Sequence, residues 1–277
     1  NAALPILASS LLFEDTELFI DNVPNIKDVE TMLKVLEALG LETAFNEHQV
    51  KLAVPKNNLL LHAAPESLVS QMRATLLVMG PMLAKKQKIE ISLPGGCSIG
   101  YRPIDLHISS LELMGAEIKL DHGILIAEAP NGLTPASIHF DIPSVGATEN
   151  IIMAAVLTKG KTVIDNAAKE PEVVDLVRFL NLAGADISGA GTSVIEINGV
   201  EKLNGVPYEI IPDRIEAATY LIAVASTGGE VVLKNVFPAH LETVISKLRE
   251  IGVVVNVDEN NDQIQVIANP PYMVEQD

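Results

Sequence analysis

The residues best suited to chemistry lie in one glycine-rich stretch, residues 93–105, which reads LPGGCSIGYRPID. It holds Cys97, the one cysteine of the sequence, directly after Pro-Gly-Gly and five residues before Arg102. A Pro-Gly-Gly sequence is not expected inside a packed element, so the thiol should be accessible. Arg102 and a helix predicted to begin at Pro103 or Ile104 would both favour the thiolate. The stretch therefore predicts a reactive thiol.

Two different roles for this stretch stay open on these grounds. A single cysteine in a cytosolic protein is often a small buried apolar residue. The consecutive backbone N–H groups of residues 95–97 could also form an anion nest. The stretch does not match the GxGxxG fingerprint, so we expect no dinucleotide.

Further segments could hold an anion. Residues 144–148, SVGAT, precede an apolar helix and could bind a phosphate at its start, although an ordinary N-cap accounts for them equally well. Arg73 stands in an apolar helical segment and could either snorkel to the surface or reach an anion. Acidic residues open helices at 170–172 and 212–216, where compensation of the helix dipole is the simpler role.

The histidines suggest neither a metal site nor a catalytic triad. Of the six, only His107 lies near residues 93–105. The sequence shows no metal-ligand spacing and no Ser/His/Asp signature, so we expect no metal and no other cofactor.

Composition narrows the class of partner. The net charge of −17 over 277 residues argues against nucleic acid or an anionic membrane, but not against a small anionic substrate held by local arginines. A single cysteine excludes internal disulfides and suits a reducing cytosol. No apolar run reaches membrane-spanning length. The chain starts without Met and stops just after Pro270-Pro271, so we expect a fragment of a longer protein.

A repeat organises the rest of the chain. Four predicted helices end at glycines that lie 75, 69 and 68 residues apart, which is the length of a whole βα module. Each module is predicted to contain an apolar helix, a short strand, the helix that ends at glycine, and a two-stranded hairpin. The glycines are Gly40, Gly115, Gly184 and Gly252; the apolar helices are expected at 2–12, 70–83, 150–157 and 215–225 and the short strands at 18–21, 89–92, 162–165 and 231–234.

This module decides the fold class. A hairpin in every unit argues against a TIM barrel or a doubly wound sheet. Residues 151–157 and 220–225 have almost no polar face, which is typical of buried helices, so we expect an α/β fold with helices inside and sheets outside. Residues 1–208 should form a complete three-unit domain, and 209–277 the first unit of a second, truncated domain. Module two carries about four extra residues, and these fall in the cysteine stretch.

Five segments resemble those of the enolpyruvyl transferase family, and within it the UDP-N-acetylglucosamine 1-carboxyvinyltransferases. They are NAALPIL at 1–7, residues 93–107, SVGAT at 144–148, NAAKEPE at 166–172 and PDRIE at 212–216. The resemblance runs along the whole chain, which is incomplete at both ends. The related 3-phosphoshikimate enolpyruvyltransferases share the fold but lack the cysteine stretch. The resemblance implies an inside-out α/β barrel of two domains with the active site between them.

The resemblance also implies an activity. It is the cytoplasmic transfer of enolpyruvyl from phosphoenolpyruvate to the 3′-hydroxyl of UDP-N-acetylglucosamine, the first committed step of peptidoglycan synthesis, without cofactor, nucleic acid or membrane. Cys97 would protonate the methylene carbon of phosphoenolpyruvate and Arg102 would meet its anion. The nucleotide sugar would be held by Asn1, Arg73, Arg102, Pro103, Ile104, Asp105, Leu106, Ser144, Val145 and Gly146.

Two alternative functions stay open. One is that of a truncated, non-catalytic homologue that binds only the nucleotide sugar or a partner. The second is that of an enzyme similar to the 3-phosphoshikimate enolpyruvyltransferases. For the enolpyruvyl transfer that the resemblance implies, half of the expected cleft lies beyond Asp277, so we expect little or no turnover from these 277 residues alone.

Overall fold

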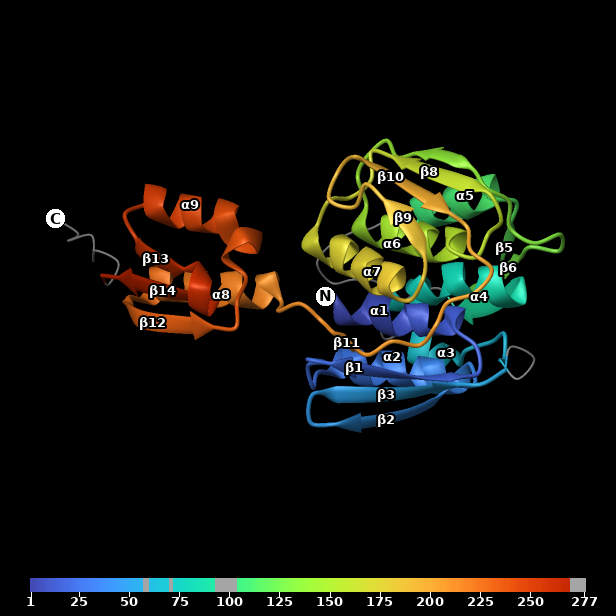
Figure 1. Ribbon diagram of the computed structural model, residues 1–277, viewed down its shortest axis with the longest axis horizontal. Helices are drawn as coiled ribbons and strands as arrows, with labels where there is room; N and C mark the ends of the chain where they lie inside the picture. Colours follow the sequence, from blue (N-terminus) through green and yellow to red (C-terminus); the bar gives the residue numbers. More distant parts are fainter. Residues whose placement is uncertain (57–59, 70–71, 93–103, 270–277) are drawn as a thin grey trace. The chain divides into compact units, whose positions relative to one another are not determined.

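A computed structural model describes residues 1–56, 60–69, 72–92 and 104–269. Its contacts divide the chain into two units, Asn1–Ile210 and Ile211–Asp277, and each is described by itself. The described residues form four sheets, three in the first unit and one in the second (Figure 1).

All four sheets share one arrangement of strands. The strand that follows the apolar helix pairs antiparallel with the second strand of the hairpin, which pairs antiparallel with the first, as in β1–β3–β2, β4–β6–β5, β8–β10–β9 and β12–β14–β13. The predicted module is confirmed. The strands are β1 Thr16–Asp21, β2 Glu42–Asn46, β3 Gln49–Val54, β4 Lys88–Ser92, β5 Glu117–Asp121, β6 Ile124–Glu128, β8 Lys161–Asp165, β9 Asp186–Ser188, β10 Val194–Asn198, β12 Gly229–Lys234, β13 Val254–Asp258 and β14 Gln263–Ala268.

The helices follow the same repeat. The second helix of each module is followed by its predicted glycine in a left-handed conformation, with φ of 106° at Gly40, 91° at Gly115, 105° at Gly184 and 87° at Gly252. Glycine adopts this conformation without the Cβ clash that bulkier residues meet. The helices are α1 Ala3–Ser9, α2 Lys27–Ala38, α3 Glu66–Val69, α4 Met79–Lys86, α5 Asp105–Leu113, α6 Val145–Ala155, α7 Pro171–Leu182, α8 Arg214–Thr227 and α9 Glu242–Glu250, with 3₁₀ turns η1 Ser10–Leu12, η3 Arg73–Val78, η4 Pro238–Leu241 and η5 Glu259–Asn261.

Parallel neighbours connect successive modules in the first unit. β7 (Ser137–His139) lies beside β8, and Ala63 forms a parallel bridge with Glu90 of β4. β11 (Tyr208–Glu209) lies parallel to β1, the first strand of the chain. Each of the three sheets therefore receives a segment from the preceding module, and the third module returns to the sheet of the first.

The apolar helices differ in burial between the two units. In the first unit the helices lie between the sheets (Figure 1), and every residue from Ala147 to Ala155 of α6 is buried, as predicted. The same prediction is wrong for α8, which exposes Ile215, Tyr220 and Ile222 by 48%, 56% and 50%. The described part of the second unit has one sheet and α9 to cover it, so only a narrow stripe of α8 is buried.

One predicted helix is divided. The sequence predicts an apolar helix at 70–83; positions 70 and 71 lie outside the described residues, Arg73–Val78 is the 3₁₀ turn η3, and α4 follows from Met79. Pro81 accounts for the division, because a proline is tolerated in the first turn of a helix but breaks its interior. None of the helices in the described residues is long and apolar enough to span a membrane.

A buried aromatic group attaches the end of the first unit to its core. The Tyr208 ring lies 5.1 Å from Phe179, which lies 5.7 Å from Phe13, measured between ring centroids. The Tyr208 hydroxyl donates to Asp175 Oδ1 at 2.6 Å, and burial followed by this bond raises the pKa of Tyr208. The Tyr208 hydroxyl therefore stays protonated and donates a hydrogen bond to the buried carboxyl group of Asp175.

We expect Tyr208→Phe to lower the free energy of unfolding of the first unit by about 1–3 kcal/mol, because a buried carboxylate loses a hydrogen-bond donor. Chemical denaturation followed by circular dichroism measures this. Tyr220→Phe is the matched control, since Tyr220 is exposed on the second unit, and it should change stability by less than about 0.5 kcal/mol. Equal effects of the two variants would contradict the role given to Tyr208.

Candidate functional site

The start of α5 carries the described part of the cysteine stretch. Cys97, Arg102 and Pro103 lie outside the described residues, which resume at Ile104, the N-cap of α5. The predicted helix start is thus correct to within one or two residues. Asp105 and Leu106 follow in the first turn, where free backbone N–H groups and the helix dipole favour an anion.

The start of α6 is the second candidate segment. Ser144 is an N-cap, and its Oγ accepts from the backbone N–H of Ala147 at 3.4 Å. Ser144, Val145 and Gly146 are half-buried, whereas the rest of α6 is buried. Thr148 Oγ1 accepts from the N–H of Ala168 at 3.1 Å, which ties the helix to the segment before α7. The predicted N-cap is confirmed, and the helix starts five residues earlier than expected.

Arg73 and the two helix starts converge on His107. Arg73 is half-buried at the beginning of η3, and its charge is close enough to lower the pKa of His107. A Cβ placed on Gly146 would lie 3.4 Å from His107 Cε1 and 3.5 Å from Nε2. His107 is in α5, two residues after Asp105. The structure therefore brings together Arg73, the start of α5 and the start of α6.

Under these accessible groups lies a buried polar layer. Asn150 Nδ2 lies 3.0 Å from His107 Nδ1 and donates to the carbonyl of Leu76 at 3.1 Å, while its Oδ1 accepts from the N–H of Gly80 at 2.6 Å. His107 is 5% exposed and Asn150 is fully buried. Burial, followed by the charge of Arg73, lowers the pKa of His107 to about 4 against the opposing effect of Asp105, so its imidazole is neutral at physiological pH.

A buried carboxyl group belongs to the same layer. Glu149 is 4% exposed, and burial, followed by the negative charge of Glu172, raises its pKa to about 8. The charge of Glu170 raises the pKa of Glu149 in the same direction. Glu149 is therefore mostly protonated near pH 7. The predicted binding residue Asn1 is exposed, two residues before the start of α1.

Glu149→Gln should stabilise the protein in a pH-dependent way. The folded-state pKa of Glu149 exceeds the ordinary value of 4.5, so the folded state binds more protons than the unfolded state between about pH 4.5 and 8. Its contribution to stability is thus full below pH 4.5 and is lost as the pH rises towards 8. We expect the variant to match wild type at pH 5 and to be about 2–4 kcal/mol more stable at pH 9.

Denaturation midpoints measured across this range check that expectation. Glu201→Gln, at an exposed position, is the control and should follow the wild-type pH profile. A constant difference between Glu149→Gln and wild type from pH 5 to 9 would show that Glu149 is not protonated in the folded state.

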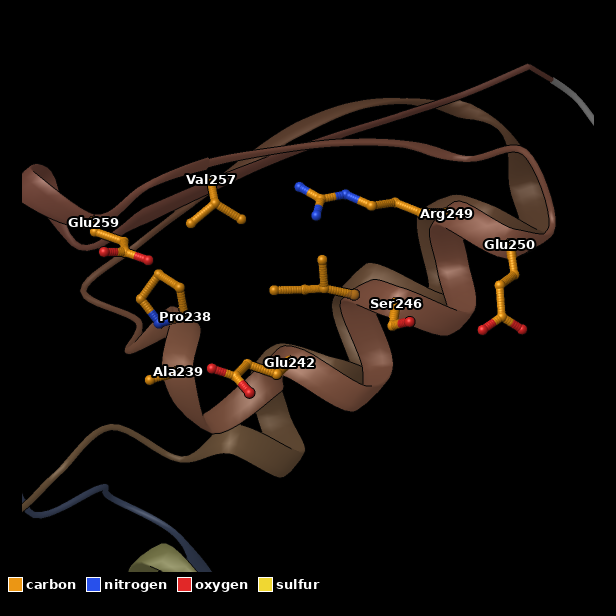
Figure 2. A pocket seen from close by; sticks show the side chains of 9 residues that line it. Pro238, Ala239, Glu242, Ser246, Arg249, Glu250, Val257 and Glu259 are labelled. Carbon is orange, nitrogen blue, oxygen red and sulfur yellow. The ribbon is translucent and has the colours of Figure 1, made fainter.

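Each of the two units contains a hollow formed by described residues. The first, of 360 Å³, is open and lined by Pro143, Ala167, Lys169 and Glu170, directly before Ser144. The second, of 480 Å³, lies in the second unit against α9 (Figure 2). There the Arg249 side chain extends from α9 and donates from Nε and Nη2 to the carbonyl of Val255, at 3.1 and 2.7 Å. The guanidinium of Arg249 is therefore held by the backbone. Within the first unit, the hollow at Pro143 adjoins the candidate residue Ser144.

The buried layer is the part of the site that the sequence pattern did not predict. The pattern singles out His107 only for its proximity to the cysteine stretch, and it assigns no role to Glu149 or Asn150. A signal was present, since Thr148, Glu149 and Asn150 are three consecutive polar residues at the start of a helix whose remaining residues are apolar. Within the described residues no group of three or more His, Cys, Asp or Glu side chains could hold a metal ion.

Known proteins resemble this chain along its length. The family model of EPSP synthase (3-phosphoshikimate 1-carboxyvinyltransferase) matches residues 1–276. UDP-N-acetylglucosamine 1-carboxyvinyltransferase 2 of Carboxydothermus hydrogenoformans is 51% identical over 269 residues, and enzyme 1 of Staphylococcus aureus is 49% identical over 265 residues. These matches cover 97% and 96% of the chain but 63% of each relative. The chain thus spans somewhat less than two thirds of the curated relatives.

Solved structures share the fold. The enolpyruvyl transferase NikO from Streptomyces tendae superimposes with a TM-score of 0.80 at 19% identity, and EPSP synthase from Acinetobacter baumannii with 0.73 at 18%. Each match covers 97% of this chain and 63% of the chain it matches. At this identity the likeness concerns the fold alone.

Proposed function

Because the chain belongs to the EPSP synthase family of enolpyruvyl transferases, we propose that its protein transfers the enolpyruvyl group of phosphoenolpyruvate to the 3′-hydroxyl of UDP-N-acetylglucosamine. This is the first committed step of peptidoglycan synthesis and would take place in the cytoplasm. The relatives from Carboxydothermus and Staphylococcus support this acceptor over 3-phosphoshikimate. The observation that carries the proposal is the convergence of Arg73 with the starts of α5 and α6 around His107.

That convergence suits the proposed acceptor. UDP-N-acetylglucosamine carries a diphosphate, which needs cations and backbone N–H groups more than it needs apolar contacts. Two helix starts and one arginine supply both, and the buried layer beneath them holds them in fixed positions. We assign to the nucleotide sugar the residues Asn1, Arg73, Arg102, Pro103, Ile104, Asp105, Leu106, Ser144, Val145 and Gly146.

Cys97 and Arg102 would act on phosphoenolpyruvate. The transfer forms a bond from the sugar hydroxyl oxygen to C2 of phosphoenolpyruvate and breaks the bond from C2 to the phosphate oxygen. Addition at C2 requires a proton on the methylene carbon, which a positioned thiol can donate and which returns to the thiolate when phosphate leaves. The proton of the sugar hydroxyl ends on the released inorganic phosphate. Arg102 would balance the negative charge of the substrate. No redox or carrier chemistry is involved, so no cofactor is required.

We also propose how the chain is divided into domains. Residues 1–208 would form a complete domain, an inside-out α/β barrel of three modules, and 209–277 the first module of a second domain. The pairing of β11 with β1 supports closure of the first domain, because the third module returns to the sheet of the first. The exposed apolar side chains of α8 support the second part, since further modules would cover them.

Release of inorganic phosphate tests the function. The full-length protein supplied with phosphoenolpyruvate should release phosphate only when UDP-N-acetylglucosamine is added, whereas residues 1–277 alone should release little. Binding of the nucleotide sugar without phosphate release would favour the non-catalytic homologue. Release that does not depend on the nucleotide sugar would contradict the proposed acceptor.

A further inference from the structure

The orientation of the Asn150 amide follows from its backbone partners. The N–H of Gly80 can only donate, so the atom 2.6 Å away must be the oxygen Oδ1. The carbonyl of Leu76 can only accept, so the atom 3.1 Å away must be the nitrogen Nδ2. Two independent backbone groups thus exclude a flipped amide.

This orientation sets the tautomer of His107. One hydrogen of Asn150 Nδ2 is directed to Leu76, and the second meets His107 Nδ1 at 3.0 Å. A nitrogen that receives a hydrogen bond must present a lone pair, so Nδ1 is unprotonated. The neutral ring then carries its proton on Nε2. A doubly protonated ring would place two donors face to face, and the nearby charge of Arg73 opposes it as well.

The protonated nitrogen faces the start of α6. The Cε1–Nε2 edge of the ring is the part that a side chain on Gly146 would touch, at 3.4 and 3.5 Å. The His107 residue is 5% exposed, and the described residues provide no hydrogen-bond partner for its Nε2. Among these residues Ser92 Oγ is the fully buried side-chain atom without a partner, so His107 Nε2 keeps a small opening through which a ligand atom could reach it. This N–H, which has no partner among the described residues, thus faces the start of an 11-residue helix, where the backbone N–H groups of Val145 and Gly146 precede the first capped N–H, that of Ala147.

We propose that His107 Nε2–H is a further substrate-binding donor for a phosphate oxygen of the nucleotide sugar at Ser144–Gly146, and that Asn150 is the positioning residue that keeps this nitrogen protonated. The inference rests on the proposed function, since it assigns a donor to its diphosphate. A neutral donor suits this position: it binds the anion without the cost of burying a second cation next to Arg73.

Asn150 also couples the position of this donor to the scaffold. Its three hydrogen bonds reach α5 through His107, the end of η3 through Leu76 and α4 through Gly80. Asn150 itself is on α6, the helix whose first turn would hold the phosphate. The donor and the helix start are therefore held at a fixed separation by one side chain.

Nitrogen NMR of the full-length protein with ¹⁵N-labelled histidine tests the tautomer. At pH 7 the His107 signals, assigned by their loss in His107→Gln, should be those of an unprotonated Nδ1 and a protonated Nε2. Asn150→Asp keeps the acceptor for Gly80 but presents no donor, so Nδ1 should become protonated. A protonated Nδ1 in the wild type would overturn the role of Asn150.

Calorimetric titration with UDP-N-acetylglucosamine tests the donor. His107→Leu should weaken binding about 10- to 100-fold, the loss expected for a hydrogen bond to a charged group, and should raise KM for the nucleotide sugar much more than it lowers kcat. His107→Gln, which can place an N–H near the position of Nε2, should recover part of the affinity. Thr158→Val is the control, because it removes a buried hydrogen bond to Ala154 beyond the end of α6 and should leave binding unchanged.

The outcomes separate this inference from the proposed function. A wild type that binds and turns over the nucleotide sugar, with a His107→Leu variant of equal affinity, would overturn the inference alone. Wild type that does not bind UDP-N-acetylglucosamine overturns the ligand assignment and the proposed function together. If His107→Leu does not fold, the Nε2 signal of the wild type decides: it should shift on adding UDP-N-acetylglucosamine, and an unchanged signal under saturation contradicts the proposal.

Discussion

We expect Cys97→Ser in the full-length protein to lower the rate of phosphate release with UDP-N-acetylglucosamine by at least about 100-fold, because a hydroxyl is a far weaker acid than the thiol it replaces. The two side chains have nearly the same size, so binding of the nucleotide sugar should be preserved. Steady-state assays of phosphate release and titration with the nucleotide sugar measure the two effects. Ser98→Ala, a neighbouring change in the same stretch, is the control and should retain wild-type turnover.

Alkylation of the thiol checks the same residue independently. Fosfomycin, an epoxide that alkylates the cysteine of the family that this stretch resembles, should add one adduct to the intact mass of the wild type and none to Cys97→Ser. Wild-type protein that stays unmodified, or a Cys97→Ser variant that turns over normally, would favour the role of Cys97 as a small buried apolar residue.

Gly80→Ala should cause the largest loss of stability among these variants, about 3–4 kcal/mol. A Cβ at Gly80 would overlap the backbone oxygen of Asn150 and lie 2.6 Å from its Oδ1. Neither atom can move easily. The backbone oxygen of Asn150 is part of α6, and Asn150 Oδ1 accepts the hydrogen bond from the Gly80 N–H. The α4–α6 crossing must open, which also separates Asn150 from its partners.

Gly146→Ala is the matched control for that variant. It is the same substitution in a helix, but its Cβ would meet only the His107 ring at 3.4–3.5 Å, an ordinary contact distance. Thermal and chemical unfolding should therefore change by less than about 1 kcal/mol, since alanine also favours the helix. Similar losses in the two variants would mean that α4 and α6 do not approach as closely as described.

Local signals were sufficient to predict the repeat. The four glycines predict helix ends because the left-handed conformation that follows a helix favours glycine, and this holds wherever the helix packs. Burial of α6 follows from its composition, whereas burial of α8 does not, because burial depends on what else packs against a helix. Composition therefore predicts that an apolar helix is buried in the complete protein. It does not predict whether the described residues include the elements that bury it.

The accessible part of the site was also predictable in part. Ser144 directly precedes α6, and serine is a preferred N-cap residue, so its capping role could be inferred from the residue type alone. The meeting of Asn150 with His107 could not, because the two residues are 43 positions apart and come together only through the packing of α5 on α6. The raised pKa of Glu149 could not be predicted either, since it results from burial first and then from the charge of Glu172 on another helix.

The identity of the acceptor is tested by a competition experiment. The full-length protein is given phosphoenolpyruvate together with equal concentrations of UDP-N-acetylglucosamine and 3-phosphoshikimate, and the products are identified by mass spectrometry. We predict that the enolpyruvyl group appears on UDP-N-acetylglucosamine alone, with one phosphate released for each product molecule. An enolpyruvyl group on 3-phosphoshikimate, or on neither acceptor, would contradict the proposed transfer to UDP-N-acetylglucosamine.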